Sequence, residues 1–111
     1  MGMPINITYD ASATGFATGP QLPVSCDWTQ NPFSLRVAVV IPAGSTATYS
    51  IEWTADSLDT TPIRWFPDAT LPAGQTSSGT TSFSSPIQFL RVNIAALSGI
   101  LEMKVIQGLP Q

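Results

Sequence analysis

Residues 35–53, which read LRVAVVIPAGSTATYSIEW, decide the fold class of this chain. Large apolar side chains occupy the odd positions of 35–41, and apolar side chains again occupy the odd positions of 47–53. Successive side chains of a β-strand point to opposite faces, so this period of two predicts two strands that each bury one face. Between them, Pro42 and Gly44 favour a tight turn.

A short turn between two such strands predicts an antiparallel hairpin. If its loop is symmetric about Gly44, Arg36 faces Glu52 across the two strands. An opposite-charge pair in that position contributes roughly 0.2–1 kcal/mol, which supports this register. A second hairpin is predicted near the C-terminus, where 90–94 and 101–105 alternate in the same way around a short turn.

The rest of the chain is also typical of an all-β protein. No stretch has the 3.6-residue apolar period of a helix, and Ser, Thr and Pro are frequent throughout. The sequence therefore predicts a single antiparallel two-sheet sandwich of about eight strands, either jelly-roll or immunoglobulin-like. It forms one domain over residues 1–111, with 1–21 considered as an extended arm. Further candidate strands are 5–9, 22–28, 63–66 and 80–84.

Composition narrows the range of functions. Charged residues make up 10% of the chain, against about 25% in ordinary soluble domains. The net charge of −3 argues against binding to nucleic acid, and the apolar run 37–41 is far shorter than the ~20 residues of a membrane helix. Histidine is absent and Cys26 is the single cysteine, which argues against imidazole-based catalysis, a zinc cluster and an internal disulfide. We expect a noncatalytic protein without cofactor or metal.

Acidic residues near the long 55–86 segment form one candidate site. Glu52, Asp56, Asp59 and Asp68 could act as a glycosidase pair or bind calcium. The interpretation we favour is that the aspartates cap turns through hydrogen bonds to nearby main-chain N–H groups, because the spacing lacks the pattern of a calcium loop.

The adjacent aromatics Trp65 and Phe66 form the second candidate site. Neighbouring side chains on a strand point to opposite faces, so one of the two rings is expected to leave the core. An exposed aromatic is typical of a protein interface, and we expect Arg64, Trp65 and Phe66 to contact a partner. Stacking on a sugar is the alternative for these rings. Cys26, with no histidine to activate it, is expected to be a small core residue.

Four segments resemble small virion proteins of tailed bacteriophages: 47–56 (ATYSIEWTAD), 65–67 (WFP), 89–94 (FLRVNI) and 101–107 (LEMKVIQ). The similarity extends over roughly residues 35–107. It implies a β-sandwich module of the phage head, and some proteins of this kind decorate, or cement, the capsid shell. The resemblance brings no catalytic residues with it.

Together these observations predict a capsid decoration protein that stabilises the head shell by binding the major capsid protein. It would be made in the bacterial cytoplasm and end up in the virion. Low charge and unprotected edge strands favour a homo-oligomer, either a dimer or a trimer, and neither nucleic acid nor membrane is expected as a partner. The alternative function is a tail- or fibre-associated sandwich that binds host glycans.

Overall fold

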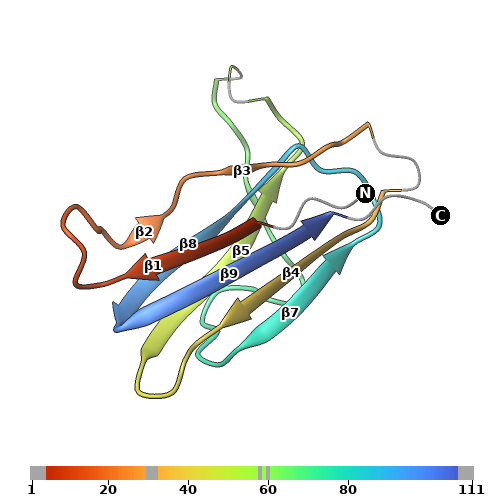
Figure 1. Ribbon diagram of the computed structural model, residues 1–111. Helices are drawn as coiled ribbons and strands as arrows, with labels where there is room; N and C mark the ends of the chain where they lie inside the picture. The colour runs from red at the N-terminus through yellow and green to blue at the C-terminus, as the bar shows by residue number, and fades with distance from the viewer. Residues whose placement is uncertain (1–4, 30–32, 58, 60, 108–111) are drawn as a thin grey trace.

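The protein is an all-β sandwich of two antiparallel sheets (Figure 1). The computed structural model describes residues 5–29, 33–57, 59 and 61–107, and these contain nine strands and no helix. The strands are β1 (Ile5–Asp10), β2 (Gly19–Pro20), β3 (Val24–Ser25), β4 (Leu35–Val40), β5 (Thr46–Thr54), β6 (Phe66–Pro67), β7 (Gly79–Phe83), β8 (Phe89–Ser98) and β9 (Ile100–Gln107).

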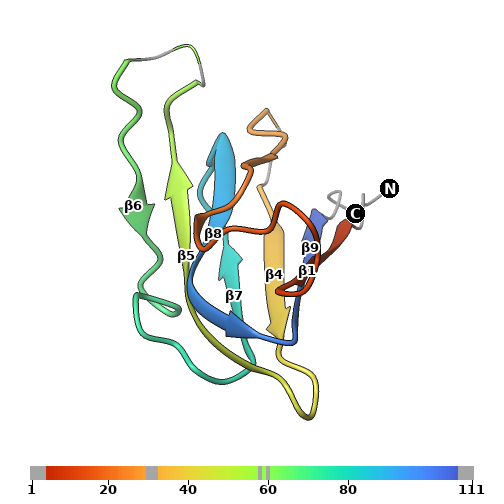
Figure 2. The same cartoon turned by 90° about the vertical axis from the view of Figure 1, so that its left-hand side faces the viewer.

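The order of the strands is that of a jelly roll. One sheet, called sheet A here, has the order β1-β9-β4-β7; the other, sheet B, has the order β2-β8-β5-β6, with β3 also paired to β8. In an immunoglobulin-like sandwich the first two strands are neighbours in one sheet, whereas here β1 and β2 belong to different sheets. Of the two topologies left open by the sequence, the strand order therefore matches the jelly roll. Figure 2 shows β6 at the outer edge of sheet B, beside β5.

Both hairpins predicted from the sequence are wrong. β4 pairs with β7 and β9, while β5 pairs with β6 and β8, so the turn at 42–45 carries the chain from one sheet to the other. β8 and β9 likewise belong to different sheets, so the short turn between them also connects the two sheets. Two strands that face each other across a core show the same alternation as two strands paired side by side, and a short turn serves either geometry. The predicted Arg36–Glu52 pair is consequently absent, and Glu52 lies opposite Arg91 instead.

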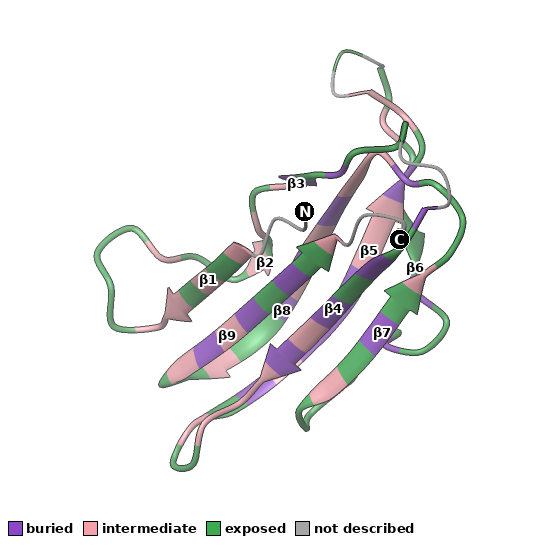
Figure 3. Cartoon of the chain, turned by 45° about the vertical axis from the view of Figure 1, so that its right-hand side comes forward, coloured by how far each residue is buried: buried purple, intermediate pink, exposed green. Residues whose placement is uncertain are grey.

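The core lies between the inward faces of the two sheets. On β4 and β9 every second residue is buried, as the alternating colours in Figure 3 show. The large side chains that are almost completely buried come from both sheets: Val37, Val39, Tyr49, Ile51, Leu90, Val92, Ile94, Leu101 and Met103. Cys26 is also buried and belongs to this core, as predicted.

The N-terminal segment is part of the sandwich over its described residues rather than an extended arm. β1 forms a six-residue antiparallel ladder with β9, from Ile5 opposite Val105 to Asp10 opposite Ile100. Gly19 and Pro20 pair with β8. Ile5, Ile7 and Tyr9 pack against the core, and this burial of apolar surface fixes the segment in place.

Candidate functional site

The edge of sheet B at β6 carries three aromatic side chains, Trp53, Trp65 and Phe66, which we call the aromatic ledge. In the β5–β6 ladder Trp53 lies opposite Phe66, and their rings stack with centroids 5.0 Å apart. The Phe66 residue is 46% exposed although its ring is fixed against Trp53. Phe66, one of the residues expected to contact a partner, is thus held by the ring of Trp53, a residue that the prediction did not include.

Trp65 lies on the opposite face of sheet B from Phe66, as their adjacent positions predicted. The centre of the Arg91 guanidinium lies 4.0 Å from the centroid of the Trp65 ring. Arg91 belongs to β8, where its neighbours Leu90 and Val92 are buried in the core, so its own side chain is directed to the outer face. A cation over an indole face contributes roughly 0.5–2 kcal/mol, depending on how far it is desolvated.

Arg91 is held over Trp65 by the carboxylate of Glu52. Arg91 Nε donates a hydrogen bond to Glu52 Oε1 at 2.7 Å, and Asn93 Nδ2 donates to Glu52 Oε2 at 3.3 Å. The side chains of Glu52 and Arg91 are each 19% exposed. The pairing of β5 with β8 places these residues opposite each other, so the ladder orients the whole network.

Arg64 is exposed, and its main chain anchors the segment that leads into the ledge. Its N–H donates to Asp56 Oδ2 at 2.9 Å, and its carbonyl accepts a hydrogen bond from Thr54 Oγ1 at 2.8 Å. No carboxylate of a described residue forms an ion pair with the Arg64 side chain. The side chain therefore remains available beside Trp65.

The acidic residues do not form a catalytic or metal centre in the part of the chain that the structure describes. Asp56 binds the Arg64 N–H, and Asp68 Oδ2 accepts hydrogen bonds from the N–H groups of Thr70 and Leu71 at 3.2 and 2.9 Å. Asp68 thus caps a turn, as predicted, although it is buried, whereas Asp56 binds a residue eight positions later instead of capping a turn, and Asp59 is exposed. Among the described residues there is no group of three or more His, Cys, Asp or Glu side chains suited to a metal ion. Within those residues, too, no helix has the length and apolar character needed to cross a membrane.

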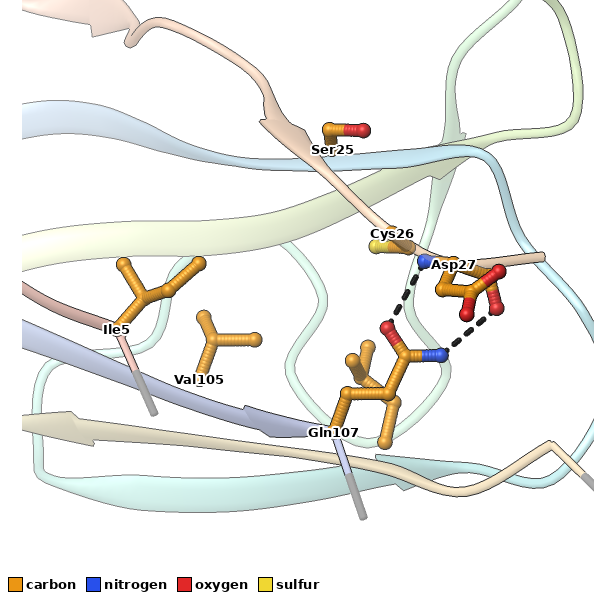
Figure 4. Close-up of a pocket in the computed structure, with 7 residues that line it drawn as sticks. Ile5, Ser25, Cys26, Asp27, Val105 and Gln107 are labelled. Carbon is orange, nitrogen blue, oxygen red and sulfur yellow. Dashed lines mark hydrogen bonds between the residues drawn. The ribbon is translucent and has the colours of Figure 1, made fainter. Parts of the chain in front are cut away.

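Two hollows accompany these features. One, of about 360 Å³, adjoins the ledge between β6 and β7 and is lined by Trp53, Pro67, Asp68, Ala69 and residues 82–87. The other, of about 380 Å³, lies between β3 and sheet A and is lined by Ile5, Ser25, Cys26, Asp27, Leu35, Val105 and Gln107 (Figure 4).

The second hollow is closed at one end by Gln107. Its Oε1 accepts a hydrogen bond from the Asp27 N–H at 2.9 Å, and its Nε2 donates to the Asp27 carbonyl at 2.8 Å (Figure 4). Burial raises the pKa of the Cys26 thiol to about 12, so this sulfur stays protonated and is a poor nucleophile. Cys26 therefore does not supply a reactive thiolate to this hollow.

Sequence reasoning proposed Trp65 and Phe66 as contact residues but missed the residues that hold their rings in place. The alternation of 90–94 shows that the Arg91 and Asn93 side chains leave the core, which is the available signal. It does not show that β8 lies beside β5, and without that pairing Glu52 was assigned to the wrong arginine.

Comparison with known proteins identifies no family for this chain. No protein-family model matches the chain, and no curated protein matches it. A solved structure that is similar to it is an appendage of Bacillus endospores, described as a novel family of disulfide-linked pili. The two chains are 15% identical with a TM-score of 0.46, and the match covers 99% of this chain and 88% of the other. A likeness at this level carries no argument about function.

Proposed function

We propose that the protein is a noncatalytic structural component of a tailed-phage virion, namely a decoration protein that binds the major capsid protein and stabilises the head shell. The low charge supports this, because few charged groups must be desolvated when surfaces meet. The resemblance of residues 35–107 to phage virion proteins supports it as well. The protein would act in the assembled head after synthesis in the bacterial cytoplasm.

The observation that carries the proposal is that Phe66 is exposed while its ring stacks on Trp53. An aromatic ring that is already fixed loses little side-chain entropy when it enters a pocket of a partner. Phe66 is in this state, since it is 46% exposed while it stacks on Trp53. Residues that dominate protein interfaces are often aromatic or arginine side chains, and Arg64 and Trp65 adjoin Phe66 in the chain.

Cosedimentation with undecorated head shells tests the proposal. We expect the wild-type protein to pellet with the shells and the Phe66→Ala variant to lose at least about tenfold in affinity, which is the effect of a strong interface residue. Trp28→Ala is the matched control, because Trp28 is 54% exposed and lies outside the ledge. Wild-type protein that stays in the supernatant would refute the decoration role; equal losses in the two variants would refute the ledge as the contact.

Glycan binding is the second candidate, and the surroundings of Trp65 are what favour it. The Trp65 ring contacts Arg91, which is bound by Glu52, and Glu52 in turn accepts a hydrogen bond from Asn93, so this network combines an aromatic ring with polar groups of the kind that bind a sugar. Against it, Trp53 and Phe66 stack on each other and Arg91 covers one face of Trp65, so the rings do not form a coplanar platform. Glycan-array binding that disappears in Trp65→Ala, together with no binding to shells, would favour this candidate over decoration.

A further inference from the structure

β7 is an edge strand without the features that usually protect an edge. It pairs with β4 on one side, and no described strand pairs with its other side (Figure 3). Its sequence, GTTSF, contains neither a charged residue nor a proline. The edges of sheet B are different: β2, β3 and β6 are each only two residues long, and β2 and β6 contain a proline. At the other edge of sheet A, β1 ends with Asp10.

The hydrogen bonds of β4 show which main-chain groups of β7 face outward. Ile41 donates its N–H to Ser78 Oγ at 2.9 Å, so the odd-numbered residues of β4 direct their main-chain groups toward β7. Val37 lies opposite Thr81 in that ladder. Because main-chain groups alternate sides along a strand, Thr80 and Ser82 direct their N–H and C=O groups to the open edge.

We propose that β7 binds β7 of a second copy of this chain, antiparallel, about a two-fold axis at Thr81. In this register Thr80 exchanges main-chain hydrogen bonds with Ser82 of the second copy, and the reverse pair forms by symmetry. The two sheets A become one continuous sheet across the interface. This inference does not depend on the proposed function, since it concerns a different edge of the molecule.

The side chains of β7 are complementary to themselves in this register. Thr80 and Ser82 are exposed on the outer face, where Thr–Ser pairs across strands are favourable and no like charges meet. On the inner face, Phe83 of one copy lies across from Gly79 of the other, so the aromatic ring faces a residue that has no side chain to clash with it. Gly79 itself packs directly under Leu71, so the ring would extend the core of each copy.

Sedimentation velocity over a concentration series tests the association. We expect a species of twice the 11.8 kDa chain mass to form as the concentration rises. The double variant Thr80→Lys/Ser82→Lys should weaken it at least about tenfold, because four positive charges would face one another across the axis. Asn6→Lys/Thr8→Lys adds the same charge at exposed positions of β1 and should leave it unchanged. Circular dichroism confirms that both variants are folded.

Disulfide trapping tests the register. Residues at the axis form a non-hydrogen-bonded pair with Cα atoms about 4.5 Å apart, which is within the range that a disulfide spans. The Thr81→Cys variant should therefore cross-link into a dimer under mild oxidation, whereas Thr8→Cys and the wild type, whose Cys26 lies outside β7 and away from the axis, should not. The proposal would be overturned if the wild-type protein stayed monomeric or if the dimer still formed in the Thr80→Lys/Ser82→Lys variant. It would also be overturned if the protein formed a dimer that Thr81→Cys did not cross-link.

Discussion

The guanidinium of Arg91 lies 4.0 Å from the centroid of the Trp65 ring and joins two segments that are 26 residues apart in the chain. Trp65 belongs to the segment that approaches β6, whereas Arg91 is on β8, and the two strands are separated by β5. Glu52, on β5, accepts a hydrogen bond from Arg91 Nε. The network therefore ties the edge of sheet B to its centre.

Replacing Arg91 with alanine should destabilise the fold by about 1–3 kcal/mol, because the half-buried Glu52 carboxylate loses its main partner. Arg91→Lys should recover only part of this, since an ammonium lacks the planar group that lies on the indole. Urea unfolding followed by tryptophan fluorescence measures both. Arg36→Ala, at an exposed position of β4, should change the free energy of unfolding by no more than about 0.5 kcal/mol. A similar loss in Arg36→Ala would contradict the role of the network.

Phe66→Ala should reduce stability by no more than about 1 kcal/mol, because nearly half of the residue is already exposed and only the stack with Trp53 is lost. The expected loss of shell binding is therefore separable from unfolding. Urea midpoints for Phe66→Ala and Trp28→Ala, measured on the samples used for cosedimentation, check this. A variant that unfolds below the binding temperature would contradict the expectation.

Gly99→Ala should be more costly than Gly74→Ala. Both glycines have positive φ, near +89° and +94°, and alanine in that conformation costs about 1–2 kcal/mol. At Gly74 an added Cβ meets nothing within 4 Å, whereas at Gly99 it would overlap the side chain of Ser45. Ser45 Oγ accepts the Ile100 N–H at 3.0 Å, so moving it also breaks a hydrogen bond. Urea unfolding should show the difference, and equal losses would contradict it.

Alkaline pH should destabilise the fold in part through Cys26. Burial raises the pKa of this thiol from 9.0 to about 12, so the unfolded chain releases its proton at lower pH than the folded protein does. The stabilisation is complete below pH 9 and is lost as the pH rises toward 12. The free energy of unfolding of Cys26→Ala should consequently fall less steeply over this interval. A thiol reagent at pH 8 should modify wild type only in urea; rapid modification of the folded protein would contradict the burial of Cys26.

Local patterns predicted the long strands, whereas β2 was not expected and the strands expected over 22–28 and 63–66 are two residues long, at 24–25 and 66–67. The pairing of strands depends on contacts that local patterns do not contain. Val37 and Ile51 both point into the core, and they would do so equally in a hairpin or in two facing sheets. The turn around Gly44 fits both cases. What distinguishes them is which strand lies beside β5, and that strand, β8, comes 35 residues after β5 ends.

In the candidate site, too, the local features were predictable from the sequence and the contacts between strands were not. The adjacency of Trp65 and Phe66 was sufficient to predict that their rings point to opposite faces. The fixed position of each ring depends on a partner from another strand, Arg91 for Trp65 and Trp53 for Phe66. The turn-capping role of Asp68 was predictable because its carboxylate binds N–H groups only two and three residues further along the chain.

β9, the last strand in the sequence, lies in the interior of sheet A between β1 and β4. In a chain still emerging from the ribosome, β1 therefore has no strand to pair with until β9 has been synthesised. Folds whose pairings join distant segments form in milliseconds to seconds rather than microseconds. Until β9 has been made and the sheets have formed, the apolar faces of β1 and β4 are exposed to solvent. Synthesis of the protein in large amounts should therefore depend on chaperones that bind incomplete chains.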